Sequence, residues 1–313
     1  MKKNLFYLTC IICFTFVMQN LISNENNQLF KKIEIPNKSS ILTIKDFGNY
    51  LVIGTRTNLH IYNKKKKSFQ DLTISDNRYP TCIFIDQKFM IVGTNKGILY
   101  SDLSNDGLQK GNVELFESDT TLTYSYINDI AYDNQYLYIA TNNGVFKSDI
   151  NFENVENITK NLEIKSNENI ELYDNKIIVG QNQGLFYNKN ESNNWRLFKT
   201  FTRDVKSICV NDTTLLFSDL ESMKIVINPE ADAKVISLPM DLGEIFNISS
   251  KDNKILAVAR NGVHISNDRG NVWKSIKFDE KYIKAGDIGD KYYFGTFMGN
   301  LYYLDFENYD KIK

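Results

Sequence analysis

The stretch IVGTNKGILYSD, from Ile91 to Asp102, decides the fold because the chain repeats it. Close copies are YIATNNGVFKSD from Tyr138, IVGQNQGLFYN from Ile178 and AVARNGVHIS from Ala257. When the copies are aligned on the small residue that ends each apolar run, they recur about every forty residues. These small residues are Gly54, Gly93, Ala140, Gly180, Ser218, Ala259 and Gly295. A period of this length is typical of solenoids and propellers.

The internal pattern of each copy favours the propeller. An alternating segment such as 127–133 comes first, and this alternation predicts a strand. A β-rich run, a polar turn and a third strand follow, and Gly144 suits the positive φ of such a turn. A more polar fourth strand, such as 195–201 or 272–278, ends the unit. The sequence therefore predicts an all-β, seven-bladed β-propeller of four-stranded antiparallel blades.

The two ends of the repeat region suggest how the ring closes. The last copy stops after its third strand, at 301–305. The segment KKIEIP at 31–36 belongs to no copy and resembles KVISLP at 234–239, the fourth strand of the fifth copy. We therefore predict that the N-terminal strand completes the last blade, which would leave the ring without a free sheet edge.

The first residues have the pattern of a targeting segment. Lys2 and Lys3 precede an uncharged, mostly apolar run at 5–18, which is too short for a comfortable membrane span. We expect residues 1–23 to be a signal peptide and 24–313 to form a single β-propeller domain. The protein would then be exported, in the periplasm, at the envelope or secreted, and an uncleaved anchor is the alternative.

Composition limits the partners. The net charge is −1, and removal of Lys2 and Lys3 with the signal peptide would make it −3, which argues against nucleic acid. We expect no integral membrane span after the signal. Only Cys82 and Cys209 remain after residue 23, in strands of blades that are not neighbours, so we expect buried free thiols.

The segment SNDRGNVW at 266–273 has the pattern Ser-x-Asp-x-Gly-x-x-Trp. It resembles the Asp-box, or BNR repeat, of sialidase-type and many non-enzymatic propellers. The resemblance implies a structural turn in which the Asp carboxylate bonds backbone amides and the Trp packs beneath. The turn residues would be Ser266, Asp268, Gly270 and Trp273. Sialidase activity is not expected, because the Arg-Ile-Pro motif is absent and the chain has only six arginines.

A second resemblance covers the repeat itself. The phrase IATNNGVF at 139–146 is similar to propeller repeats of two-component sensor ectodomains and of periplasmic or lumenal assembly factors. Sensors of that type continue into a membrane span, and the sequence given ends at Lys313. The resemblance implies an extracytoplasmic propeller, not one particular protein.

Four arginines fall in turns and linkers that propeller topology places on one face, around the mouth of the central channel. Arginine suits bidentate capture of carboxylate or phosphate and protein interfaces. Aromatic residues are expected beside them. The predicted binding residues are Arg56, Arg78, Tyr79, Arg203, Arg260, Tyr282 and Phe297. Chance placement of surface arginines is the alternative.

The remaining candidates favour structure over chemistry. His60 and His264 occupy a column that is apolar in other copies, so we expect them to be packed, with no metal site and no cofactor. The segment 102–107 resembles the start of a calcium loop, but a decayed hairpin explains it equally well. The lysine run 64–67 is expected to be a solvated turn on the opposite face, with contact to an anionic membrane as the alternative.

Together these patterns predict a non-enzymatic binding or assembly module that holds a protein or glycan partner on one propeller face. A glycosidase- or lyase-type enzyme with its site at the channel mouth is one alternative. A soluble sensor subunit that binds a small ligand is the other.

Overall fold

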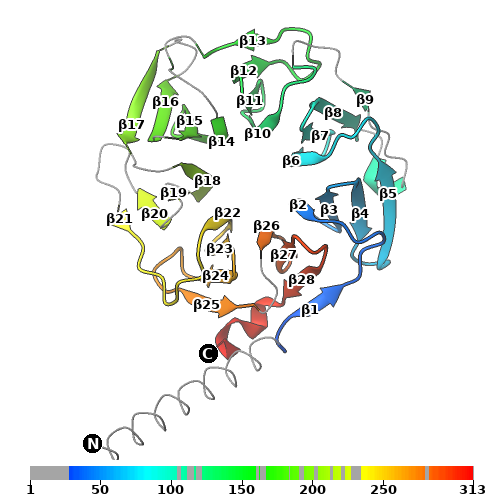
Figure 1. The fold of residues 1–313 in the computed structure, drawn as a ribbon, viewed down its shortest axis with the longest axis vertical. Coiled ribbons are helices and arrows are strands. Elements are labelled where there is room, and N and C mark those ends of the chain that lie inside the picture. The colour runs from blue at the N-terminus through cyan, green and yellow to red at the C-terminus, as the bar shows by residue number, and fades with distance from the viewer. Residues whose placement is uncertain are drawn as a thin grey trace, which may run out of the picture.

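Small sheets stand around a central axis, each with one strand at the inside of the ring and one at the rim (Figure 1). The computed structural model describes residues 28–103, 107–110, 116–117, 122–159, 162, 167–182, 184–189, 194–200, 204–211, 214–219, 223–226, 234–278 and 282–312. The predicted signal peptide, residues 1–23, lies outside them. The arrangement confirms the predicted all-β propeller with small, antiparallel, four-stranded blades.

The described strands pair into seven four-stranded sheets. The innermost strands are β2 (Ile41–Phe47), β6 (Pro80–Ile85), β10 (Ile127–Tyr132), β14 (Asn167–Tyr173), β18 (Val205–Asn211), β22 (Ile245–Lys251) and β26 (Ile283–Ile288). The second strands are β3 (Tyr50–Thr55), β7 (Phe89–Thr94), β11 (Leu137–Thr141), β15 (Lys176–Gln181), β19 (Thr214–Asp219), β23 (Lys254–Ala259) and β27 (Tyr292–Thr296).

The third strands are β4 (Asn58–Asn63), β8 (Gly97–Asp102), β12 (Gly144–Ser148), β16 (Gly184–Lys189), β20 (Met223–Val226), β24 (Gly262–Ser266) and β28 (Leu301–Leu304). The outermost strands are β5 (Ser68–Thr73), β9 (Phe116–Glu117), β13 (Glu156–Asn157), β17 (Trp195–Thr200), β21 (Lys234–Val235), β25 (Lys274–Lys277) and β1 (Lys31–Ile33). Two short helices, α2 (Gly107–Lys110) and the 3-10 helix η1 (Phe306–Lys311), complete the described elements.

Strand β1 lies in the same sheet as the last three strands of the chain. It pairs with β28 in antiparallel register, with Lys31 opposite Tyr303 and Ile33 opposite Leu301. The Lys31 ammonium also lies 2.9 Å from the Asp305 carboxylate. The outer position of this sheet is thus filled by a strand from the other end of the described chain (Figure 1).

The small residue that defines the repeat marks the place where adjacent sheets meet. A Cβ added to Gly93 would lie 2.7 Å from Cγ2 of Ile127, in the innermost strand of the next sheet. Gly54 has the same relation to Pro80, and Gly180 to Val205. Real Cβ atoms do not approach other atoms so closely, so these positions have room only for glycine, and the equivalent places in other copies hold no residue larger than Ala or Ser.

The same contact joins the last sheet to the first. A Cβ on Gly295 of β27 would overlap Cγ2 of Ile41, which begins β2. Buried residues of both sheets share one apolar cluster, which includes Leu51, Ala285 and Tyr293. The apolar core is therefore divided into layers, each of which lies between neighbouring sheets.

Both histidines are packed inside sheets, as predicted. His60 and His264 are buried, and Nδ1 of His60 lies 2.7 Å from Oδ1 of Asp71. Nδ1 of His264 lies 2.7 Å from the Ser275 hydroxyl, and burial lowers the pKa of His264 to about 4. His264 is therefore neutral at physiological pH.

The cysteines are also as predicted. Cys82 and Cys209 are buried free thiols, and burial raises the pKa of Cys209 to about 12. At that pKa the thiol stays protonated and unreactive.

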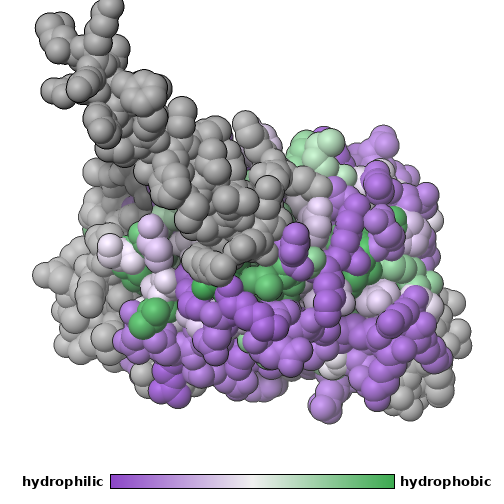
Figure 2. Space-filling view, turned by 90° about the horizontal axis from the view of Figure 1, so that it is seen from below, coloured by the Kyte–Doolittle hydropathy of each residue, from purple (hydrophilic) through white to green (hydrophobic). Residues whose placement is uncertain are grey.

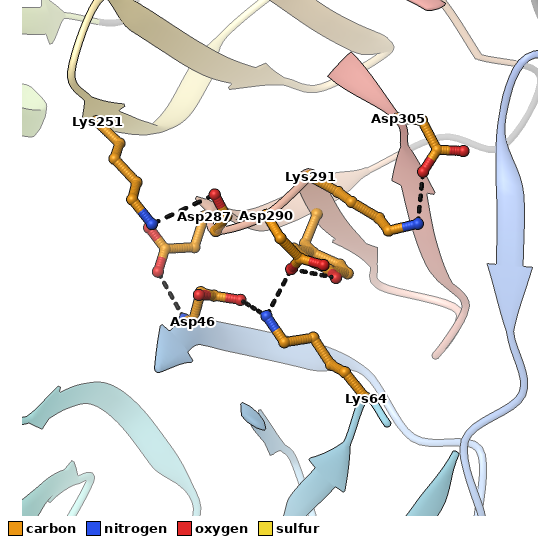
Figure 3. A network of polar contacts seen from close by, with 9 residues as sticks. Asp46, Lys64, Lys251, Asp287, Asp290, Lys291 and Asp305 are labelled. Carbon is orange, nitrogen blue, oxygen red and sulfur yellow. Dashed lines mark hydrogen bonds and ion pairs between the residues drawn. The ribbon is translucent and has the colours of Figure 1, made fainter. Parts of the chain in front are cut away.

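The lysine run contains one exception to the predicted solvated turn. Lys65, Lys66 and Lys67 are exposed, but only 11% of the Lys64 side chain is. Its ammonium lies 2.6 Å from Asp46 and 2.5 Å from Asp290, in a polar network that links the first and last sheets (Figure 3). Sequence reasoning treated Lys64 as free because Asp290 is remote in the chain.

We predict that Gly295→Ala lowers the free energy of unfolding by about 1–3 kcal/mol, because the added methyl group overlaps Ile41. Combining it with Ile41→Ala should cost less than the sum of the single changes, with a coupling of about 0.5–3 kcal/mol. Denaturant unfolding of the three variants measures this coupling.

Ser218→Ala is the matched control, because Ser218 occupies the equivalent place and already has a Cβ. It loses one hydrogen bond to the Ile245 carbonyl and should cost no more than about 1.5 kcal/mol. Additive effects of Gly295→Ala and Ile41→Ala would contradict the steric explanation.

Candidate functional site

A cavity of about 600 Å³ lies where the innermost strands converge. Every innermost strand shifts register against its second strand at the same point, such as Ile41/Thr43 in β2 and Ile127/Asp129 in β10. Each shift is a β-bulge, which leaves one residue unpaired and bends the strand. The unpaired residues that line the cavity are Leu42, Thr81, Asn128, Lys206, Phe246 and Lys284.

Polar side chains next to these bulges fasten several innermost strands to the following one. Asp129 accepts a hydrogen bond from the Ile170 amide at 3.1 Å, and Asn247 accepts one from Gly286 at 3.0 Å. The Ser207 hydroxyl likewise accepts the Ile248 amide at 2.9 Å. Each of these three bonds joins residues about forty positions apart, in the innermost strands of neighbouring sheets.

The charged groups of the cavity wall are mixed in sign. The cationic residues are Lys45, Arg56, Lys206 and Lys284, and the anionic residues are Asp129, Glu171, Glu244 and Asp287. Asp287 accepts bonds from the Ser249 hydroxyl at 2.6 Å and the Asp46 amide at 2.7 Å. Lys45 lies 4.0 Å from Asp287, which raises the pKa of Lys45.

Asp129 and Glu171 come from neighbouring strands, β10 and β14. Burial raises the pKa of Asp129 to about 6 and that of Glu171 to about 8. The charge of Asp129 raises the pKa of Glu171 further, while Lys45 opposes this shift. At neutral pH the pair therefore holds close to one proton, mostly on Glu171.

One side of the channel mouth carries a cation stacked on aromatic rings. The Arg56 guanidinium lies 5.3 Å from the centre of the Tyr79 ring. The Tyr79 and Tyr126 rings are 6.4 Å apart in an edge-to-face arrangement. All three line the cavity, so the stack faces its entrance.

A second stack is built around Arg260. Its guanidinium bonds to the Glu244 carboxylate at 2.7 Å and lies 5.4 Å from the Tyr282 ring. Tyr282 and Phe297 are 6.5 Å apart, and the Lys284 ammonium lies 4.8 Å from the Phe246 ring. We call the residues of the two stacks the mouth surface: Arg56, Tyr79, Tyr126, Glu244, Phe246, Arg260, Tyr282, Lys284 and Phe297.

Exposed apolar side chains gather in the same set of loops. Tyr124 is 80% exposed, Met298 is 67% exposed, and Tyr282, Phe297 and Met240 are also exposed. All five lie in linkers that enter an innermost strand or in turns between second and third strands. The part of the rim seen in Figure 2 is mostly hydrophilic, with hydrophobic residues in separate small areas. Gathered apolar residues on one surface are typical of an interaction site.

Not every predicted binding residue is where the sequence suggested. The structure brings Arg56 and Tyr79 together, and Arg260, Tyr282 and Phe297 together. Arg78 was predicted to be on the binding face, but it is only 8% exposed and has interactions within the protein. A residue this buried offers little surface to a partner, so Arg78 is wrong as a contact residue. Arg203 lies outside the described residues.

Sequence reasoning missed the charged residues deeper in the channel. Lys45, Glu171 and Asp287 occupy equivalent positions, three residues after the unpaired residue of their bulges. A bulge is not visible in a single sequence, so the alternation of the strand gave no reason to place Lys45 or Glu171 in the channel.

The SNDRGNVW turn between β24 and β25 is held by its own side chains. Asp268 accepts bonds from the Ser266 hydroxyl and the Val272 amide, both at 2.8 Å. Gly270 has a φ of 86°, and its carbonyl accepts the indole N–H of Trp273 at 2.8 Å. Trp273 is buried, and none of these residues lines the cavity. The turn is therefore structural.

Two negative findings concern the described residues only. None of their helices is long and apolar enough to cross a membrane. None of their His, Cys, Asp and Glu side chains form a group of three or more that could hold a metal ion. Residues 104–106 of the calcium-loop-like segment lie outside this part of the chain.

No family model and no curated protein matches this sequence. Solved structures match the fold. The extracellular domain of the putative hybrid two-component system BT4673 from B. thetaiotaomicron superposes with a TM-score of 0.73 and 17% identity. The match covers 87% of this chain but 39% of that one, so this chain spans well under half of its length.

Two further solved structures cover this chain to a similar extent. A chain from the mitotic checkpoint complex has a TM-score of 0.64 and 11% identity, over 88% of this chain and 90% of that one. The computationally designed Ika8 protein has a TM-score of 0.62 and 9% identity, over 86% and 97%. Identities this low establish the propeller fold and nothing about activity.

We predict that Asp268→Ala destabilises the protein by about 1–3 kcal/mol, because it removes two hydrogen bonds of the turn. Asp268→Asn keeps one acceptor oxygen and should lose less. Thermal or denaturant unfolding separates the two variants, and equal losses would contradict the role assigned to the carboxylate.

The raised pKa of Glu171 predicts that stability falls as pH rises. The folded state keeps the proton up to about pH 8, whereas a Glu in the unfolded chain loses it near its usual pKa of 4.5. Stability from this group is therefore complete at low pH and is lost as pH rises from 4.5 to about 8.

Glu171→Gln should flatten the upper part of this dependence. The unfolding midpoint is measured at several pH values between 6.5 and 8.5, because Asp129 and His264 titrate mostly below this range. The variant should be more stable than the original protein at pH 8.5. Glu153→Gln, at an exposed position, is the charge-matched control and should keep the original slope.

Proposed function

We propose that this chain is an exported, non-enzymatic binding module that holds a protein or glycan partner on the mouth surface. In this proposal the scaffold is a closed seven-bladed ring, with β1 as the outer strand of the last blade. The turn at 266–273 is an Asp-box that serves the fold, and residues 24–313 form one domain after removal of the signal peptide.

The observation that carries the proposal is the combination of cations, aromatic rings and exposed apolar side chains around one opening. Arg56 stacks on Tyr79, and Arg260 stacks on Tyr282 beside Phe297. Aromatic residues and arginine are the side chains most enriched in the centres of protein interfaces. Aromatic faces also suit the apolar faces of sugar rings, so a glycan fits the same surface.

Rigid presentation supports this function. The loops of the mouth surface extend from innermost strands that are bonded to one another through Asp129, Ser207 and Asn247. A preorganised surface loses little conformational entropy on binding. Export is supported by the signal-like pattern of residues 1–23 and by the likeness to an extracellular domain.

One observation favours a second candidate, an enzyme that acts in the channel. Asp129 and Glu171 line one cavity with different pKa values, about 6 and about 8. Carboxyls whose pKa values are separated in this way can act as base and acid. A panel of glycoside and polyuronate substrates tests this candidate, and turnover that Glu171→Gln abolishes would favour it over the binding module.

The binding module is tested with Arg56→Ala/Arg260→Ala in one chain. The purified protein is immobilised and exposed to a native envelope extract and to a glycan array. We expect to recover a specific partner. Its affinity for the double variant should be lower by at least about tenfold, which is equivalent to about 1.4 kcal/mol of binding free energy. The affinity falls because the double variant lacks both cation–aromatic stacks.

Arg196→Ala is the matched control, since Arg196 is exposed in β17, an outermost strand away from the mouth. It should bind as the original protein does. Equal retention of the partner by the double variant would refute the role of the mouth surface.

A further inference from the structure

Among the described residues of the cavity wall, Asp129 and Glu171 are the carboxylates that have no cation within 4.0 Å. Glu244 is paired with Arg260 at 2.7 Å, and Asp287 lies 4.0 Å from Lys45. In the described part of the chain, no Lys, Arg or His nitrogen lies within 4.0 Å of the carboxylates of Asp129 and Glu171. The pair therefore differs from the other carboxylates of the wall.

The fold places Asp129 and Glu171 on neighbouring innermost strands that are bonded to each other. The Asp129 carboxylate accepts the amide of Ile170, the residue before Glu171, at 3.1 Å. The Ile130 amide also donates to Asp129 at 2.9 Å, so the position of this carboxylate is fixed from both strands. Both acidic side chains line the same cavity. They form a preformed acceptor on one side of the channel.

We propose that the central cavity binds a small organic molecule with a single ammonium group, which sits between Asp129 and Glu171. Ammonium N–H groups form strong charge-assisted hydrogen bonds with carboxylates. The proposal concerns the inside of the channel and does not depend on the partner of the mouth surface.

Size and lining favour an organic molecule over a bare metal ion. A volume of about 600 Å³ is in the range of small-molecule sites. The described side chains offer no group of three metal-binding residues. The wall instead carries amide and hydroxyl groups, among them Asn169, Asn247 and Ser249. Each makes a bond within the wall and keeps further hydrogen-bonding capacity, which suits a polar, hydroxylated ligand body.

Lys45 limits the charge of the ligand. It faces the same space from β2 and lowers the pKa of Glu171. Its ammonium would repel a second positive group, so a monoamine such as an amino sugar or amino polyol fits better than a diamine. Lys45 thus makes the site selective for monoamines over diamines, although both kinds of ligand carry an ammonium group.

Binding should be linked to proton release. The titratable groups that interact electrostatically with Glu171 are Asp129 on β10, Lys45 on β2 and Cys209 on β18. Burial raises the pKa of Glu171 to about 8. An ammonium group binds the ionised carboxylate better than the protonated one. Affinity should therefore rise as pH increases through the neutral range and level off above about pH 8, with displacement of the Glu171 proton.

Isothermal titration calorimetry with meglumine tests the proposal, with sorbitol as the probe that has the same polyol body without the amine. Alkyl amines stay protonated across neutral pH, so the pH dependence belongs to the protein. We expect meglumine to bind with an affinity that rises about fivefold or more between pH 6.5 and 8.5. Proton release should be visible in buffers of different ionisation enthalpy.

Sorbitol and putrescine should bind at least about tenfold more weakly than meglumine. Glu171→Gln and Asp129→Asn should each lower the affinity for meglumine by about tenfold or more. Glu171→Gln should also abolish the proton release. Glu153→Gln is the control and should bind as the original protein does. If Glu171→Gln does not fold, Asp129→Asn and the proton release of the unaltered protein still decide the question.

Three results would overturn the proposal: no heat of binding for meglumine, equal binding of meglumine and sorbitol, or undiminished binding by both carboxyl variants. Tighter binding of putrescine than of meglumine would overturn the selectivity assigned to Lys45. Binding of calcium alone, without meglumine, would make the pair a metal site.

Discussion

The contact between a small residue of each second strand and the first apolar residue of the next innermost strand is the constraint on which the structure depends. Gly93 leaves room for Ile127, and Gly295 leaves room for Ile41. A Cβ at these glycines would force the sheets apart, because protein interiors have little free volume. The small residue of the repeat therefore reflects the close packing between sheets. The same contact sets the distance between neighbouring sheets and so leaves a channel at the centre.

The bulge in each innermost strand is the second constraint, and it gives the channel its chemistry. An unpaired residue allows polar side chains such as Asp129 and Asn247 to reach the backbone of the following strand. These bonds satisfy buried groups that a regular strand would leave without partners. Residues not needed for this purpose, above all Glu171, remain in the cavity as potential ligand contacts.

The sequence predicted features that depend on neighbours within one repeat. The strands, the structural turn around Asp268 and the packed positions of His60 and His264 follow from alternation, spacing and the turn glycine. The prediction for Arg78 was wrong because a linker residue can turn inward without any change in local pattern. Lys64 was misjudged for a related reason, since its partner Asp290 comes from the other end of the chain.

The sequence by itself determined the blade, because close packing between sheets leaves a small residue, Gly, Ala or Ser, about every forty positions. Only the tertiary structure decided which polar residues meet. Asp129 and Glu171 lie in different repeats, and their pairing depends on bulges and on the angle between sheets. Their raised pKa values come from burial, which is a property of the assembled ring. Local periodicity encodes the scaffold, whereas electrostatics arise between residues that the fold brings together.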